Sequence, residues 1–195
     1  MNGPEIELSL CLTGPYSLMA GSQHTLINEV DPNLGGIYVW AVPFNGVYYP
    51  QYVGHTHCFV ERLIEHLINL RLGREYYYDT SELANGKLGD GRSPGSAEPF
   101  SQAKADEYAR FVRFYLASDP EFKEKRLRER VELALALKLD ESICEPGLPK
   151  VWDKTCSGNH PQANGPRTGE PTVRFRIASS AGLAMMPMPG EPLEA

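Results

Sequence analysis

Most of the fold can be predicted from two segments, GGIYVW at residues 35–40 and QYVG at residues 51–54, and from the helical pattern that follows at 56–72. Both segments are rich in β-branched and aromatic residues, which favour strands. The segment PFNG at residues 43–46 lies between them and is typical of a turn. Together they predict a β-hairpin that is followed at once by a helix.

The length of the turn decides which face of the hairpin each tyrosine occupies. A two-residue loop at 45–46 pairs Tyr38 with Val53 and leaves Tyr38 and Tyr52 on opposite faces. A three-residue loop at 44–46, with its glycine in the left-handed conformation, pairs Tyr38 directly with Tyr52. We favour the three-residue loop because it places two phenols side by side on one face.

The helix that follows is expected to begin at Thr56, as its N-cap, and to stop at Gly73. Its apolar positions repeat at helical spacing and form one stripe: Phe59, Val60, Leu63, Ile64 and Leu67. Arg62 and His66 are four residues apart and share a face, with Asn69 three residues further on as a candidate substrate-binding residue. A cation and an imidazole beside two tyrosines make a plausible site for a phosphodiester.

The chain resembles the GIY-YIG endonucleases in the order and spacing of four features: GIY at 36–38, YVG at 52–54, Arg62 and His66. The resemblance covers residues 36 to about 153. It implies a DNA partner, phosphodiester hydrolysis and Mg²⁺ or Mn²⁺ as cofactor. It implies that Tyr38 is the general base for water with Tyr52 assisting, that Arg62 holds the phosphate, and that His66 orients a tyrosine or shares the proton.

Glu132 is expected to complete this site from a later helix. It lies in the apolar run VELALA at 131–136, where solubility alone does not explain an acid. The structural alternative is an i,i+4 partner for Arg128. The resemblance implies that an acid in this helix is a carboxylate ligand for the divalent cation, and Glu132 matches the family pattern better than Glu129 does.

The fold class expected is α+β, with a small central antiparallel three-stranded sheet flanked by helices, as in GIY-YIG domains. The third strand is predicted at 110–116, after a short helical turn at 102–107, and a helix capped by Asp119 at 120–139. A further strand is predicted at 172–177.

This interpretation divides the chain into three parts. Residues 1–35 form an N-terminal extension that packs on the core, and residues 36–153 form the nuclease-like domain, with a loop insertion at 79–100. Residues 154–195 form a C-terminal extension that ends in an ill-ordered tail. Related domains end the core with an asparagine where this chain has Asp153; Asn159 is the candidate substitute for binding substrate, and the choice between Asp153 and Asn159 stays open.

Composition limits the partners and the compartment. The 195 residues carry a formal net charge of −6, which counts against a nucleic-acid partner, but residues 104–130 are rich in Lys and Arg and could form a local basic surface. The four cysteines form no CxxC pair and are expected to be free thiols. No apolar run could cross a bilayer and no basic secretory start is present, so a cytoplasmic location without a membrane partner is expected.

Two other function classes stay open. A nucleic-acid-binding module that has lost cleavage would keep Arg62 and the basic helix but tolerate loss of Glu132. A protein-interaction module of the same fold would need none of the five site residues. The oligomeric state is open as well, and a homodimer that cuts two strands is one possibility.

Overall fold

The computed structural model describes residues 5–19, 30–44, 47–87, 92, 94–95, 99–142, 172–177 and 186–187. The strands are β1 (Glu5–Leu10), β2 (Thr13–Tyr16), β3 (Gly36–Phe44), β4 (Val47–Thr56), β5 (Arg113–Ala117), β6 (Thr172–Ile177) and β7 (Met186–Pro187). The helices are α2 (Phe59–Arg71), α3 (Thr80–Ala84), α4 (Gln102–Phe111), the 3-10 helix η1 (Pro120–Lys123) and α5 (Lys125–Ser142). The class is α+β, as predicted.

The main sheet has the strand order β2-β5-β3-β4-β7 and is antiparallel. The three strands expected from the sequence, β5, β3 and β4, lie at its centre. The N-terminal arm adds β2 at one edge, and β7 pairs with the start of β4 at the other. Separately, β1 and β6 form a two-stranded parallel sheet, so the strand predicted at 172–177 is confirmed.

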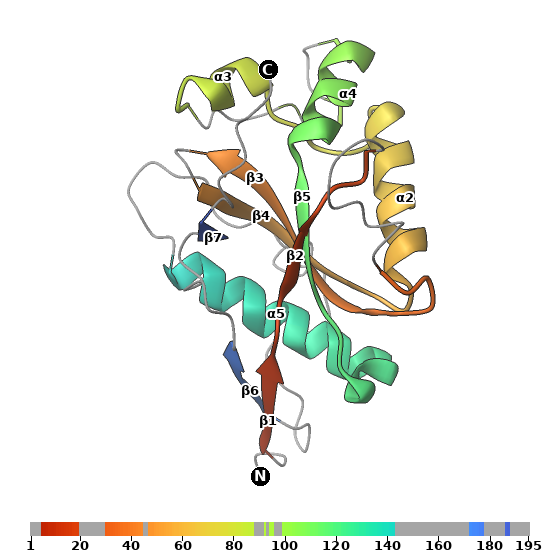
Figure 1. Cartoon of the computed structure of the whole chain (residues 1–195), viewed down its shortest axis with the longest axis vertical. Coiled ribbons are helices and arrows are strands. Elements are labelled where there is room, and N and C mark those ends of the chain that lie inside the picture. The colour runs from red at the N-terminus through yellow and green to blue at the C-terminus, as the bar shows by residue number, and fades with distance from the viewer. Residues whose placement is uncertain are drawn as a thin grey trace.

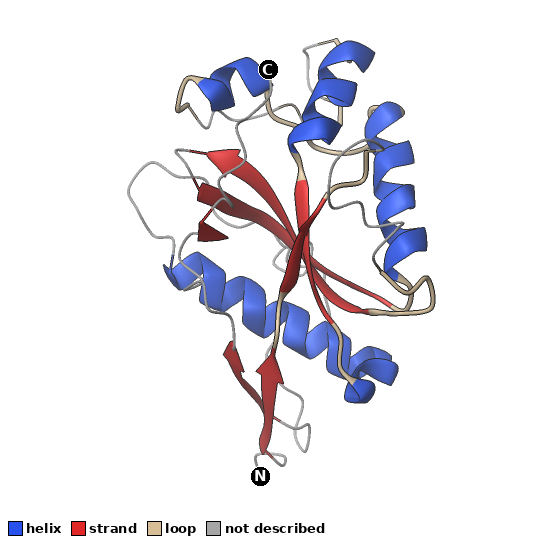
Figure 2. Ribbon diagram, viewed as in Figure 1, coloured by secondary structure: helices blue, strands red, loops and turns tan. Residues whose placement is uncertain are grey.

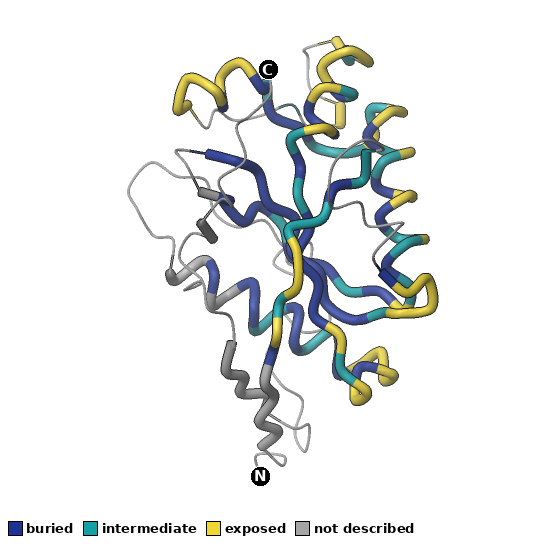
Figure 3. The backbone as a smooth tube through the Cα atoms, viewed as in Figure 1, coloured by how far each residue is buried: buried dark blue, intermediate teal, exposed yellow. Residues whose placement is uncertain are grey.

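Helices cover both faces of the main sheet (Figures 1 and 2). In these views α5 runs along one side, against β3 and β4, and α2 and α4 lie together on the other side. Every residue of β3 is therefore buried, as Figure 3 shows by its continuous dark blue trace. A strand covered on both faces reads as one apolar run, which is why residues 36–44 alternate so little.

The hairpin register differs from both predicted pairings. Phe44 pairs with Val47 at the turn, so the favoured three-residue loop is wrong. The ladder then shifts by one residue at Gln51, which has no opposite partner, and Tyr38 lies opposite Gly54. This β-bulge, which no turn rule could indicate, sets the faces of the two site tyrosines.

The helix α2 begins later than predicted. Thr56 is still part of β4, where it pairs with Gly36, and the N-cap is Cys58, whose Sγ accepts a hydrogen bond of 3.5 Å from the backbone N–H of Glu61. The helix ends as expected, because Gly73 adopts a left-handed φ of 68° just beyond the C-cap.

The helix predicted at 120–139 is divided. Asp119 caps a single turn, η1, as expected, but Glu124 is extended with ψ 121° and α5 begins at Lys125. The Arg128 guanidinium donates to two carbonyls at the end of η1, including that of Lys123 at 3.0 Å. These bonds satisfy the carbonyls where the helix is interrupted.

The remaining boundaries shift in the same local way. The helical turn predicted at 102–107 extends to residue 111 as α4, so β5 begins at Arg113 rather than at residue 110. The insertion at 79–100 contains α3, capped by Asp79. In the part of the chain that the structure describes, no helix is both long enough and apolar enough to span a membrane.

Candidate functional site

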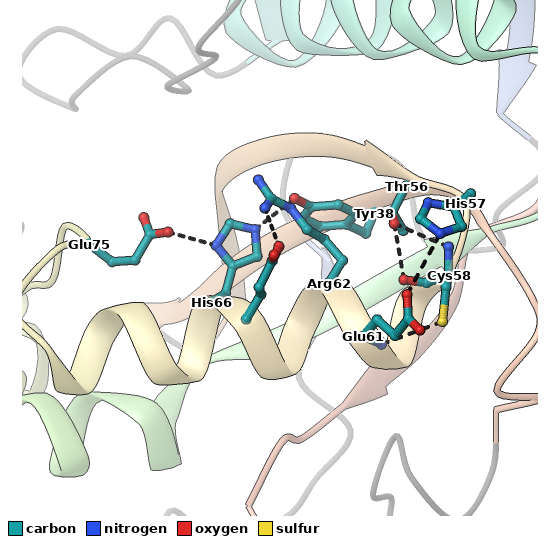
Figure 4. Close-up of polar contacts among 9 residues, drawn as sticks. Tyr38, Thr56, His57, Cys58, Glu61, Arg62, His66 and Glu75 are labelled. Atoms are coloured by element: carbon teal, nitrogen blue, oxygen red, sulfur yellow. Dashed lines mark hydrogen bonds and ion pairs between the residues drawn. The ribbon is translucent and has the colours of Figure 1, made fainter.

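The centre of the candidate site is a buried chain of hydrogen bonds that begins at Tyr38. The Tyr38 hydroxyl lies 2.7 Å from Nε2 of His66, and Nδ1 of His66 lies 3.0 Å from Oε1 of Glu75 (Figure 4). Tyr38 comes from β3, His66 from α2, and Glu75 from the segment just after α2. Tyr38 and His66 are almost completely buried, with relative exposures of 0% and 1%.

The Tyr38 ring occupies this position because Gly54 lies opposite it on β4. A Cβ atom at residue 54 would stand 2.3 Å from both Cζ and the hydroxyl oxygen of Tyr38, well inside van der Waals contact. Only glycine leaves room for the phenol to lie across the strand and reach α2. The glycine of the YVG segment therefore shapes the site directly.

Tyr52 lies on the same face as Tyr38, as predicted, but as a diagonal neighbour. The bulge at Gln51 pairs Tyr52 with Trp40, and the two tyrosine rings lie 6.0 Å apart between centroids. Tyr108 on α4 donates a hydrogen bond of 2.5 Å to Oε1 of Gln51 and holds the bulge. Both phenols therefore meet in one polar cluster, although not by direct cross-strand pairing.

Arg62 connects this cluster with solvent. Its Nη1 atom lies 2.6 Å from Oε2 of Glu65, and its side chain keeps a relative exposure of 30%. Burial raises the pKa of Tyr38 to about 12, against opposing effects of the Arg62 charge and of hydrogen bonds from Arg62 and Tyr52. Burial likewise raises the pKa of Tyr52, helped by the neighbouring Tyr38 and Glu132. Both phenols are therefore protonated at neutral pH.

Glu132 reaches the site from α5. It is buried, with a side-chain exposure of 5%, and its Oε2 lies 2.5 Å from Nδ1 of His55 on β4. The Glu132 charge acts to raise the pKa of both phenols, so its carboxylate is electrostatically coupled to them. The i,i+4 pair with Arg128 considered above is not what holds it. Among the described residues no group of three or more His, Cys, Asp and Glu could hold a metal ion.

A groove of about 730 Å³ runs beside these residues, between α2 and α5. Residues 55–57 at the end of β4, Arg62 and Glu65 of α2, and Lys125 and Arg128 of α5 contribute to its walls. Arg62 and His55 each belong to this wall and also contact the buried groups behind it. An anionic ligand in the groove would therefore meet the cations at its wall, with the phenols buried behind Arg62 and the Glu132 carboxylate buried behind His55.

The sequence-predicted residues are brought together to different degrees. The Tyr38, Tyr52 and His66 rings contact one another, and Arg62 interacts with Tyr38. Glu132 contacts His55 and acts on the two phenols through its charge. Asn69 lies one turn beyond His66, half-buried, and is not among the groove-lining residues. Asp153 and Asn159 lie outside the described residues.

Two residues of the cluster were not predicted. Glu75 contacts His66, yet it follows the helix in an irregular segment where no periodicity marks it. His55 follows the YVG segment directly, and its contact with Glu132 joins positions 77 residues apart, which no local pattern indicates. A comparison with protein-family models, curated proteins and solved structures finds no match for the chain.

Proposed function

We propose that the protein is a divalent-metal-dependent DNA endonuclease of the GIY-YIG type, which hydrolyses phosphodiester bonds. The observation that carries the proposal is the Tyr38 hydroxyl held 2.7 Å from His66, with the Tyr52 phenol beside it and with Arg62 between this buried cluster and the groove. A buried phenol on an imidazole is suited to proton transfer, and a guanidinium at the surface is suited to a phosphate. Few purely structural roles need all of these groups together.

In the proposed reaction Tyr38 is the general base. As its phenol gives its proton to His66, the phenolate takes a proton from the water that attacks phosphorus. Arg62, once turned from Glu65 to the substrate, binds the scissile phosphate and stabilises the charge that develops on its oxygens. Tyr52 supports the Tyr38 anion through their hydrogen bond, which acts to lower the pKa of Tyr38.

The residues present could hold Mg²⁺ or Mn²⁺ through a single protein carboxylate. Mg²⁺ keeps several waters and is often bound through one or two carboxylates together with substrate phosphates. Glu132 offers one buried carboxylate beside the groove, and His55 already occupies one of its oxygens. Glu132 would hold the ion, which supplies charge relief at the phosphate and help for the leaving oxygen. A cation that takes most ligands from DNA and water needs no larger protein cluster.

The cations that line the groove would attract the DNA, although the net charge of the chain is negative. The groove includes the cations Arg62, Lys125 and Arg128 but also the acids Glu61 and Glu65. This balance predicts modest affinity with limited non-specific binding. The cytoplasmic location and the homodimer that the sequence left open stay predictions.

Cleavage of supercoiled plasmid with Mg²⁺ and with EDTA tests the proposal. We expect nicking only with the metal, a loss of about 10²- to 10³-fold in Arg62→Ala, and no detectable activity in Glu132→Gln. Matched controls on the same helices are Arg71→Ala, at an exposed residue paired with Asp106, and Glu129→Gln. Equal activity in Glu132→Gln and Glu129→Gln would remove the metal assignment.

A second candidate is a module that binds nucleic acid without cutting it. The pairing of Arg62 with Glu65 and of Glu132 with His55 favours it, because both charged groups already have protein partners. Such a binder would shift DNA in a gel with or without Mg²⁺ and would leave plasmid intact. Absence of any shift at low salt would instead indicate a protein-interaction module.

A further inference from the structure

Glu75 has a defined contact for which the sequence offers no explanation. The left-handed turn at Gly73 reverses the chain at the end of α2, and the backbone N–H of Arg74 donates to the carbonyl of Asn69 at 2.8 Å. This turn brings the Glu75 carboxylate back along the helix to Nδ1 of His66, 3.0 Å away. The Glu75 side chain has a relative exposure of 16% and that of His66 only 2%, so the contact is largely shielded from water.

The contact determines which nitrogen of His66 carries the proton. An ionised carboxylate can only accept hydrogen bonds, so Nδ1 of His66 must donate to Glu75. In the neutral ring Nε2 is then an acceptor, and the hydrogen bond of 2.7 Å with Tyr38 must be donated by the phenol. The opposite tautomer would give His66 no donor for Glu75 and would leave Tyr38 facing an N–H.

We propose that Glu75 is a positioning residue that fixes the Nδ1-protonated tautomer of His66, so that Nε2 accepts the hydrogen bond and then the phenol proton of Tyr38. The inference rests on the proposed function for its purpose, but its geometry does not depend on cleavage. In this proposal Glu75 acts through His66, which its carboxylate contacts at 3.0 Å.

The proton transfer is balanced within the three residues. The O–H bond of Tyr38 breaks as an N–H bond forms at Nε2 of His66, which gives a phenolate beside an imidazolium. The Glu75 carboxylate offsets the new positive charge, and the phenolate then takes a proton from water. Because burial raises the pKa of Tyr38 to about 12, the phenolate needs a facing positive charge, and the imidazolium formed on His66 supplies it.

Other charged and titratable groups also face the pair. Tyr52 on β4 and Trp40 on β3 pack against the His66 ring, and the exposed Glu65 on α2 interacts with the His66 charge. Arg62 and Glu132 act on Tyr38 in opposite directions. Glu65 interacts with His66 through its charge, whereas the Glu75 carboxylate lies 3.0 Å from Nδ1 of the ring.

Long-range proton–nitrogen NMR of His66 in the full, metal-free chain tests the assignment. We expect Nδ1 to be protonated in the neutral ring of the wild type. In Glu75→Gln the amide can accept from Nδ1 or donate to it, so the nitrogen shifts should move toward a mixture of tautomers. The pH midpoint of His66 should fall by about one to three units, because a facing negative charge is lost.

Glu82→Gln is the matched control, since Glu82 is an exposed carboxylate on α3. It should leave the His66 nitrogen shifts and midpoint unchanged. Wild-type shifts that show Nε2 protonated, or the same shifts and midpoint in Glu75→Gln as in wild type, would overturn the proposal. These readouts hold even if the protein cuts no DNA, so failure of the proposed function is distinguished from failure of the tautomer assignment.

If the protein cleaves, its pH profile gives a second readout. His66 must be neutral to accept a proton, so the rate should rise as pH passes the His66 midpoint. Glu75→Gln should move this acidic limb to lower pH by the shift seen in NMR and lower the plateau roughly 10- to 100-fold, with KM little changed. A lower plateau with an unmoved limb would indicate a structural defect and contradict the positioning role.

Discussion

Replacing Gly54 by alanine should displace the Tyr38 phenol without touching any charged group. The new Cβ would stand 2.3 Å from Cζ and the hydroxyl oxygen of Tyr38, where ordinary contacts begin near 3.4 Å. The ring must therefore move by about 1 Å, which is enough to break its hydrogen bond of 2.7 Å with His66. Gly54 sits in a strand, where alanine would otherwise be tolerated.

The expected loss of stability follows from three contributions. Overpacking a filled interior costs about 1–3 kcal/mol, and loss of the phenol hydrogen bond adds about 1 kcal/mol. Against these, alanine restricts the unfolded chain and stabilises by about 0.4–1 kcal/mol. The free energy of unfolding of Gly54→Ala should therefore fall by about 2 kcal/mol, and Tm by roughly 4–8 °C for a chain of this size.

A double-mutant cycle separates this contact from other effects. Leucine at position 38 lacks the Cζ and hydroxyl atoms that the new methyl group would meet. In the Tyr38→Leu background Gly54→Ala should be neutral or slightly stabilising, so chemical denaturation should give a coupling free energy of about 2 kcal/mol. An equal loss in both backgrounds would refute the claim that Gly54 makes room for the phenol.

Three further predictions use other measurements. Ultraviolet titration of tyrosinate should show Tyr38 ionising near pH 12. Because this folded-state pKa lies above the ordinary value of 10, the free energy of unfolding that Tyr38 contributes is present below pH 10 and is lost between about pH 10 and 12. Asp79 has a pKa of about 2, lowered by hydrogen bonds from Lys104 and Ser81. Its contribution to the free energy of unfolding is therefore present above about pH 4 and lost as pH falls toward 2. Replacing Lys104 by alanine should raise the pKa of Asp79 measured by NMR. Binding of DNA should weaken with salt with a log–log slope no steeper than about −3, since about three cations line the groove; a slope near zero would argue against phosphate contacts.

The elements could be predicted from sequence because their signals are local. The apolar run at 36–44, the helical stripe after residue 58 and the Asp119 cap each depend on neighbours within a few positions. The same local rules failed at the hairpin register. The bulge at Gln51 is held by Tyr108, 57 residues away, and no turn preference carries that information.

In the candidate site too, contacts set by local spacing were predictable and contacts between distant segments were not. Arg62 and His66 share a helix face by spacing alone, so their proximity was predictable. The two phenols were expected together for the wrong reason, since a bulge and a diagonal contact replace the direct pair. Glu75 could not be found, because its contact depends on the reversal at Gly73 and on a carboxylate nine residues from His66. Contacts that a turn or a distant helix creates leave no periodic trace in the sequence.

Single-turnover cleavage of a labelled duplex by wild type and by Tyr38→Phe tests the central claim most directly. Phenylalanine fills the same space and removes only the hydroxyl, so the protein should stay folded, with about 1 kcal/mol lost from the hydrogen bond with His66. With Mg²⁺ present, the account predicts that the cleavage rate falls by about 10²- to 10⁴-fold, as expected when a general base is removed. Cleavage by Tyr38→Phe at the wild-type rate would contradict it.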